Sequence, residues 1–134
     1  MKMTRLGKGG PEVSQFGIGA MSFAGIYGDA TEADSHAVLD ACRAAGVTHI
    51  DTSNVYGAGR SEEIIGTWLA AHPGAREDMV IATKAGISSR ETSEGRQRCF
   101  DNSPAHLEGE LDKSLARMGT DHVDLFYVHR RDPD

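Results

Sequence analysis

The sequence predicts an α/β fold built on a parallel sheet. Strand-like and helix-like segments alternate along the chain, which is typical of repeated βαβ units. The strand-like segments are rich in apolar residues on both faces, as are parallel strands that are covered on both sides. A length of 134 residues ordinarily corresponds to one domain, so we expect residues 1–134 to form one unit.

Four strands and one hairpin are expected from these patterns. The strands are residues 14–21, 47–51, 78–84 and 122–129. The segment RLGKGGPEV, before the first strand, contains a Gly-Gly-Pro turn signal and resembles a hairpin. The stretch 85–102 is polar with mixed charges, and we interpret it as a loop.

Three helices are expected between the strands, at residues 31–46, 61–74 and 103–119. Thr31 and Asp34 form a capping-box pattern, and Ser61 and Ser103 are candidate N-caps. The expected buried face of the first helix comprises Val38, Ala41, Cys42 and Ala45. The expected buried face of the third comprises Leu107, Leu111, Leu115 and Met118.

The composition argues against several classes of function. A net charge of -6 and a pI near 5.4 leave no basic footprint for a nucleic acid. No apolar run reaches the length of a membrane span, and the first residues contain no apolar signal-peptide core. The two cysteines, Cys42 and Cys99, form no CxxC motif, which fits a reducing compartment. We therefore expect a soluble cytoplasmic protein without nucleic-acid or membrane partners.

Polar side chains stand at the ends of three expected strands: Asp51, Lys84 and His129. Strand alternation can point all three toward one face at the carboxyl edge of the sheet. That edge is where barrels and open α/β sheets place their active sites. Tyr56, on the loop after the second strand, can fold back over the same edge.

These residue types together suit proton transfer to an oxygen that gains negative charge. A phenol is ordinarily a weak acid with a pKa of about 10, and a neighbouring ammonium such as Lys84 lowers that pKa. Asp51 can hold the ammonium in place, Tyr56 can donate the proton, and His129 can orient the accepting oxygen. General acid catalysis contributes roughly 10²–10⁴-fold. The set predicts reduction of a carbonyl.

The chain also resembles a known family. The segments GIGAM, HIDTSNVYGAGRSEEIIG, VIATKAG and SLARMGTDHVDLFYVHR are similar in order and spacing to those of aldo-keto reductases, from about Leu6 to Arg130. The resemblance implies a parallel (β/α)8 TIM-type barrel, of which this chain supplies about the first four strands and three helices. Residues 1–134 would then be the N-terminal half, with the C-terminal half absent. The implied reaction is hydride transfer from NADPH, with NADH as the alternative, to an aldehyde or ketone.

The resemblance also implies roles for individual residues. It assigns proton donation to Tyr56, tuning of the phenol to Lys84 and Asp51, and carbonyl orientation to His129. The nicotinamide ribose would lie against Asp51 and the backbone of Gly19, Ala20, Met21 and Ser22. The substrate pocket would be bordered by Met21, Phe23, Tyr27, Val55 and Arg130. The family's adenine and 2′-phosphate contacts come from the second half of the barrel and cannot be mapped here.

Two other functions remain open at this point. A metal-dependent barrel hydrolase could use His49, Asp51 and His129 as ligands, although the neighbouring cation of Lys84 opposes divalent metal binding. A non-catalytic binding or scaffold protein could keep the reductase fold as an interaction module. In either case a half-barrel would expose unpaired strand edges, so we expect self-association.

Overall fold

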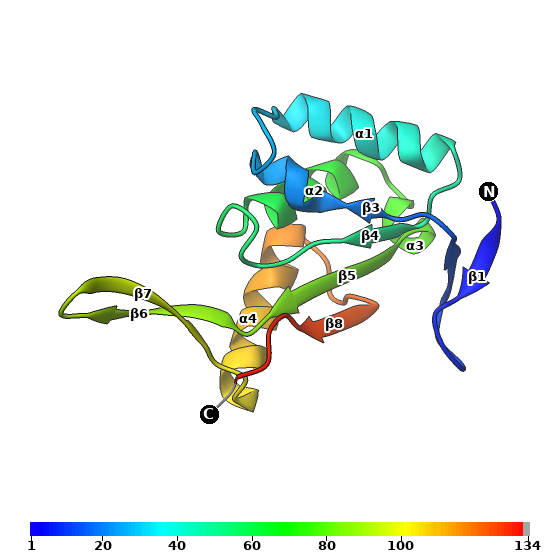
Figure 1. Ribbon diagram of the computed structural model, residues 1–134. Coiled ribbons are helices and arrows are strands. Elements are labelled where there is room, and N and C mark those ends of the chain that lie inside the picture. The colour runs from blue at the N-terminus through cyan, green and yellow to red at the C-terminus, as the bar shows by residue number, and fades with distance from the viewer. Residues whose placement is uncertain (133–134) are drawn as a thin grey trace.

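A four-stranded parallel sheet forms the centre of the molecule (Figure 1). The structure is a computed structural model that describes residues 1–132. The strands, in spatial order, are β3 (Ile18–Gly19), β4 (His49–Asp51), β5 (Val80–Ala85) and β8 (Leu125–Val128). Each neighbouring pair is parallel, with Asp51 opposite Ala82 and Lys84 opposite Tyr127. The predicted parallel α/β sheet is confirmed.

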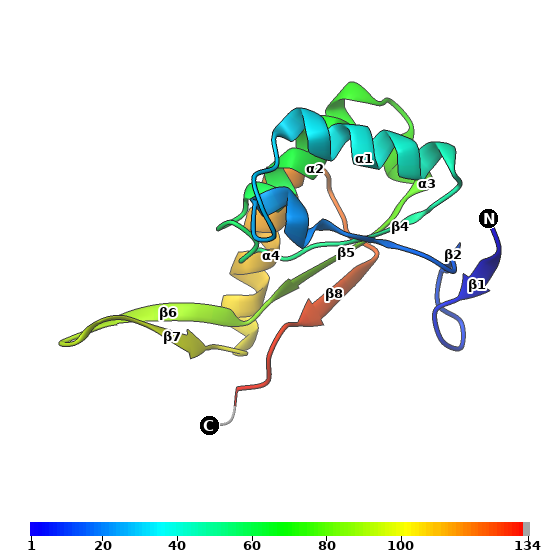
Figure 2. The same cartoon turned by 45° about the horizontal axis from the view of Figure 1, so that its top comes forward.

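The helices cover one face of this sheet (Figures 1 and 2). They are α1 (Glu32–Ala44), α2 (Arg60–Ala71), the short α3 (Ala75–Asp78) and α4 (Pro104–Met118). Ile50 and Ile81 of the sheet are fully buried in one apolar cluster with residues of α1, α2 and α4. Those helical residues include Leu39, Ile64, Ile65, Trp68 and Met118. Within residues 1–132, no helix combines the length and apolar character needed to cross a bilayer.

Two predicted helix starts are confirmed and one is wrong. Thr31 and its partner Asp34 form a full capping box at α1, and the Ser103 hydroxyl accepts from the third residue of α4. Helix α2 instead follows Gly59, which has a positive φ of 98°. Ser61 lies inside the first turn, where it is buried and its hydroxyl donates to the backbone oxygen of Ala20 at 2.8 Å. A tertiary hydrogen bond therefore takes the place of the expected cap.

The predicted buried face of α1 needs correction. Val38 is 47% exposed, whereas Ser35 and Leu39 are buried. Ser35 can be buried because its hydroxyl donates to the Thr31 backbone oxygen at 3.0 Å, which satisfies its polar group within the helix. The face of α4 is nearer to expectation: Met118 is fully buried and its three leucines are half-buried.

The first predicted strand is shorter than expected. Only Ile18–Gly19 pairs with β4, and the chain then turns into the 3-10 helix η1 (Ala20–Ala24). The preceding hairpin is confirmed as β1 (Met3–Arg5) paired antiparallel with β2 (Glu12–Ser14). The end of β2 joins the body through Ser14 and Thr48, which exchange two hydrogen bonds of 2.9 Å.

The stretch 85–102 is a β-hairpin, not the predicted loop. Its strands are β6 (Ile87–Thr92) and β7 (Gly95–Phe100), paired from Ile87–Phe100 to Thr92–Gly95. The hairpin projects from the body of the molecule in both views (Figures 1 and 2). Because both faces of its outer part lie in water, the strands lack the apolar alternation that marks a half-buried strand.

Candidate active site

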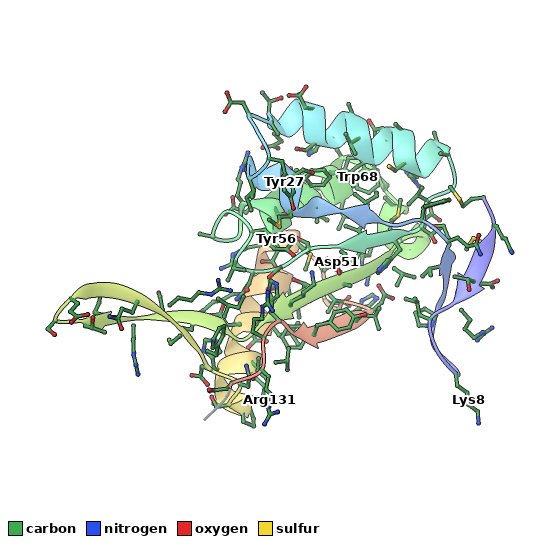
Figure 3. The ribbon with its side chains drawn as sticks, viewed as in Figure 1. Lys8, Tyr27, Asp51, Tyr56, Trp68 and Arg131 are labelled. Atoms are coloured by element: carbon green, nitrogen blue, oxygen red, sulfur yellow. The ribbon has the colours of Figure 1, made fainter. Side chains whose placement is uncertain are left out.

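An ammonium and a carboxylate meet at the carboxyl end of the sheet. Asp51 is the last residue of β4 and Lys84 is the fifth residue of β5; Figure 3 labels Asp51 among the side chains. The Lys84 Nζ donates to the Asp51 carboxylate and, at 2.9 Å, to the backbone oxygen of Thr52. The Lys84 side chain is 15% exposed, while Asp51 remains 38% exposed. The pair is therefore fixed in place but open to a ligand on the carboxylate side.

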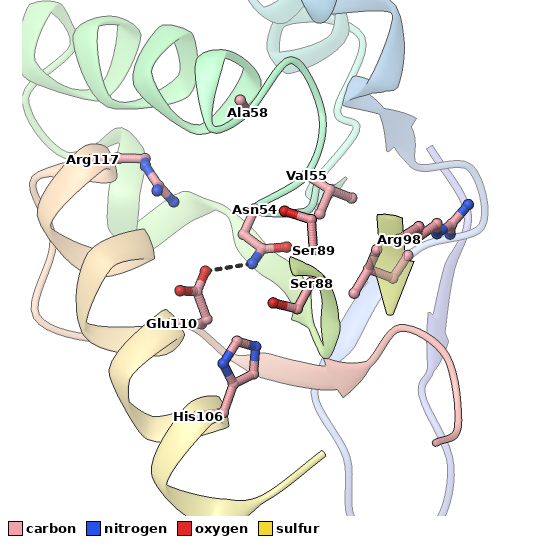
Figure 4. A pocket seen from close by; sticks show the side chains of 10 residues that line it. Asn54, Val55, Ala58, Ser88, Ser89, Arg98, His106, Glu110 and Arg117 are labelled. Atoms are coloured by element: carbon pink, nitrogen blue, oxygen red, sulfur yellow. Dashed lines mark hydrogen bonds between the residues drawn. The ribbon is translucent and has the colours of Figure 1, made fainter. Parts of the chain in front are cut away.

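The loop after β4 brings Tyr56 to the same ammonium. The Tyr56 hydroxyl lies 3.4 Å from the Lys84 Nζ, and the ammonium lies 5.1 Å from the centre of the phenol ring. Two hydrogen bonds hold the loop: Asn54 N–H donates to the Lys84 backbone oxygen, and the Asn54 side-chain amide donates to Glu110 at 2.6 Å (Figure 4). The loop is thereby tied to both β5 and α4.

His129 follows β8 directly and completes the cluster. Its backbone N–H donates to the Ala85 oxygen at 2.7 Å, which extends the parallel pairing by one residue. Its ring stands edge-on to Tyr56, with ring centres 5.8 Å apart, and its Nδ1 lies 2.9 Å from the Ser53 hydroxyl. Burial, followed by the positive charge of Lys84, holds the pKa of His129 below its usual value. The imidazole is therefore neutral at pH 7, since the ordinary value is about 6.5.

The residues expected to contact a cofactor lie beside Asp51. Gly19 pairs with Asp51 across the β3–β4 register, and η1 continues directly from it. Gly19 is exposed, and a Cβ added to it would meet no atom within 4 Å. Ala20 is buried, while Met21 and Ser22 are half-buried. An open stretch of backbone and a half-exposed carboxylate thus lie side by side at this edge of the sheet.

The residues expected to border a substrate are only partly brought together. The hydroxyl of Tyr27, which is 77% exposed, lies 3.8 Å from the Met21 sulfur. Val55 lies directly before Tyr56 in the loop between β4 and α2, and the positive charge of Arg130 acts on His129. Phe23 is the exception, because it is buried in the hydrophobic core rather than beside the cluster.

A cavity of about 490 Å³ adjoins the loop between β4 and α2 that carries Tyr56 (Figure 4). It lies between that loop, α4 and the β6–β7 hairpin, and its lining includes Val55, Arg98, His106 and Glu110. The hairpin's contribution was not foreseen, because 85–102 was interpreted as a loop. Ser53 was also missed, although its position two residues after Asp51 is the spacing that places strand side chains on one face.

The three residues considered as metal ligands are not assembled as a site. The Nδ1 of His49 lies 3.0 Å from the backbone oxygen of Val80, farther down the sheet. Asp51 is paired with the ammonium of Lys84. Across the described part of the chain, no three His, Cys, Asp or Glu side chains lie close enough to hold a metal ion.

Comparison with known proteins agrees with this architecture. The sequence profile described as "Aldo/keto reductase family" matches residues 15–134. The chain is 39% identical over 107 residues to 6-dehydroglucose reductase of Agrobacterium fabrum, covering 78% of this chain and 36% of that protein. It is 38% identical over 122 residues to the aldo-keto reductase yakc [NADP(+)] of Schizosaccharomyces pombe, covering 91% of this chain and 35% of that protein.

Solved structures agree in fold. An aldo-keto reductase from Bacillus halodurans in its holo form superposes with a TM-score of 0.78 and 31% identity, over 94% of this chain and 39% of that one. A glycerol dehydrogenase from Gluconobacter oxydans superposes with a TM-score of 0.80 and 28% identity, over 98% of this chain and 40% of that one. The sheet and helices are thus part of a (β/α)8 barrel, and the chain spans 35–36% of the two curated relatives. The chain belongs to the aldo/keto reductase family.

Proposed function

We propose that this chain is the N-terminal half of a barrel, residues 1–134, that reduces an aldehyde or ketone to an alcohol with NADPH. The observation behind the proposal is the position of one ammonium: Lys84 contacts the Asp51 carboxylate and lies 3.4 Å from the Tyr56 hydroxyl. The three groups meet at the carboxyl edge of a parallel sheet, where barrel enzymes place their chemistry.

Tyr56 is the proposed proton donor. When a carbonyl becomes an alcohol, its oxygen gains negative charge and must receive a proton. The Tyr56 hydroxyl can supply it, and the positive charge of Lys84 then stabilises the negative charge left on the phenol oxygen. Asp51 holds the ammonium in position, because it accepts one of the Nζ hydrogen bonds.

His129 is proposed to orient the carbonyl rather than to give up a proton. Its lowered pKa keeps the ring neutral at pH 7. A neutral imidazole has one N–H, which can donate a hydrogen bond to the carbonyl oxygen. Its ring stands against Tyr56, so both donors can reach one oxygen atom.

The nicotinamide end of the cofactor fits the edge formed by β3, η1 and Asp51. Gly19 offers exposed backbone for close approach, and the open oxygen of Asp51 can accept from a ribose hydroxyl. Ala20, Met21 and Ser22 continue that edge. When bound, the cofactor supplies the hydride. We propose NADPH rather than NADH because one relative, the yakc aldo-keto reductase, is named for NADP(+).

The proposed substrate is a small carbonyl compound. Met21, Tyr27, Val55 and Arg130 would border it, at the edge where Tyr56 stands. Phe23 can affect this pocket only by supporting η1 from the core.

Replacement of the proton donor tests the proposal in a protein that joins this chain to the remaining strands of the barrel. Tyr56→Phe is expected to lower kcat for a small aldehyde by roughly 10²–10⁴-fold. NADPH affinity should stay near wild type, because the cofactor contacts are unchanged. The comparison variant is Tyr27→Phe, which removes an exposed hydroxyl at the proposed substrate border rather than in the Lys84 cluster, so it should change KM more than kcat. Retention of most of the wild-type kcat by Tyr56→Phe would refute the assignment. A scaffold protein would show no turnover in any variant.

For the 134-residue chain alone, we propose weak NADPH binding and self-association. Within the described residues, β3 and β8 are the outer strands of the four-stranded sheet, and Tyr127 and Val128 of β8 are exposed. Unpaired strand edges favour association with a second chain. Light scattering should show a dimer or larger species, and fluorescence titration should show little NADPH binding. A stable monomer with micromolar NADPH affinity would contradict both expectations.

A further inference from the structure

A buried hydroxyl touches the proposed carbonyl-orienting histidine. Ser53 is fully buried, and its Oγ lies 2.9 Å from Nδ1 of His129. The two residues are 76 positions apart in the chain and meet only because β4 and β8 end at the same edge of the sheet. Ser53 is thus well placed to control which nitrogen of the ring holds the proton.

The Ser53 hydroxyl has one proton and three possible acceptors. They are Nδ1 of His129 at 2.9 Å, the Lys84 backbone oxygen at 3.2 Å and the Asn54 side-chain oxygen at 3.5 Å. A hydroxyl can donate to only one of them at a time. The choice determines the tautomer of the neutral ring: if Nδ1 accepts, its proton must be on Nε2.

Two observations favour Nδ1 as the acceptor. It makes the shortest of the three contacts. The Lys84 oxygen does not depend on Ser53, because it also accepts from the backbone N–H of Asn54 at 3.2 Å. The Val55 N–H, at 3.5 Å, can donate to a lone pair that the Ser53 oxygen retains. With this arrangement the Ser53 hydroxyl, Nδ1 of His129 and the Lys84 oxygen each have a partner, as buried polar groups require.

We propose that Ser53 is a positioning residue that donates its proton to Nδ1 of His129 and so holds the ring as the Nε2–H tautomer. This inference rests on the role proposed for His129, since an Nε2–H can donate to a carbonyl oxygen whereas a lone pair on Nε2 would repel it. The opposite arrangement, with Nδ1–H donating to Ser53, would present that lone pair to the substrate.

The tautomer can be read directly in the 134-residue chain. A long-range ¹H–¹⁵N NMR spectrum at pH 8 distinguishes a protonated ring nitrogen from an unprotonated one, and His129→Gln identifies the signals. We expect a protonated-type shift at Nε2 and an unprotonated-type shift at Nδ1. In Ser53→Ala the ring should sample both tautomers, so that the two nitrogen shifts move toward each other. Ser35→Ala is the matched control, because it removes another buried hydroxyl and should leave these shifts unchanged.

Two results would overturn the inference. One is an Nδ1–H ring in the wild-type chain, and the other is an unchanged His129 signal in Ser53→Ala. If Ser53→Ala does not fold, the wild-type spectrum decides alone. Because the measurement uses no cofactor, substrate or turnover, its result is separate from that of the Tyr56→Phe experiment. Loss of the reductase function would leave the tautomer unchanged, and a wrong tautomer would leave the Tyr56 test intact.

Discussion

The two faces of the central sheet differ sharply although the same strands form both. On the helix-covered face, Ile50 and Ile81 are completely buried. On the opposite face, Lys84 is 15%, Asp51 38% and Tyr127 43% exposed. Because successive side chains of a strand point to opposite faces, a buried core residue and a residue of the candidate site can be direct neighbours in the sequence.

The two faces of the sheet have different roles, one in stability and one in holding charged groups near solvent. Apolar surface removed from water stabilises the fold, at about 25 cal/mol per Å². A charged group gains nothing from burial unless it is paired and hydrogen-bonded. The Lys84–Asp51 pair meets that condition while its carboxylate stays open on one side. The helix-covered face therefore holds the fold together, and the open face keeps charged groups within reach of a ligand.

The largest expected difference between the faces is in stability. Trp68 is fully buried, and its indole N–H donates to Asp40 at 2.8 Å. Trp68→Ala should lower the free energy of unfolding by about 3–5 kcal/mol. Tyr127→Ala, on the open face, should lower it by only about 0.5 kcal/mol. Urea denaturation of both variants measures the contrast. Equal losses would show that the open face contributes as much to stability as the helix-covered face, which would contradict the contrast.

A smaller effect is expected where two helices on the covered face touch. A Cβ added to Gly66 of α2 would lie 2.4 Å from the Arg117 backbone oxygen. Gly66→Ala should therefore lower the free energy of unfolding by about 1–3 kcal/mol, since the added methyl group would force the packed backbone of α4 to shift. Gly109→Ala is the control in α4, where a Cβ would meet nothing within 4 Å. It should stabilise by about 0.5–1 kcal/mol. A neutral Gly66→Ala would mean that α2 and α4 are less closely packed.

The smallest expected effect comes from the open face and depends on pH. Burial lowers the pKa of His129 in the folded state, so the unfolded chain binds this proton more readily. The free energy of unfolding should therefore fall as the pH drops below about 6.5 and level off below the folded pKa. His129→Gln should remove this part of the pH dependence. Urea denaturation at pH 5 and pH 8 compares the two proteins, and an identical pH dependence in the variant would contradict the assignment.

Much of the fold and part of the candidate site could be predicted from local patterns. The capping box at Thr31 and the Ser103 N-cap of α4 need only residues a few positions apart, and both are confirmed. The strand-end positions of Asp51 and Lys84 follow from apolar runs, and the structure does bring these two side chains together. Such signals are readable because strand alternation and helix capping are properties of a short stretch of chain.

Contacts between distant segments could not be predicted in this way. Ser61 was expected to cap the start of α2, yet Ser61 and its neighbour Glu62 are both fully buried. Glu62 accepts from Thr83 of β5 at 2.6 Å and pairs with Arg117 of α4 at 2.8 Å. The 85–102 hairpin likewise forms through backbone pairing that its charged side chains do not reveal.

The sequence by itself determined the order of the four parallel strands and the three longer helices, and the polar residues at or next to the ends of three of those strands. Only the tertiary structure decided which of those residues meet. Lys84 reaches Asp51 across 33 positions, and Ser53 reaches His129 across 76. The physical reason is that parallel strands bring their carboxyl ends to one edge only after the intervening helices have packed, and no local pattern encodes that distance.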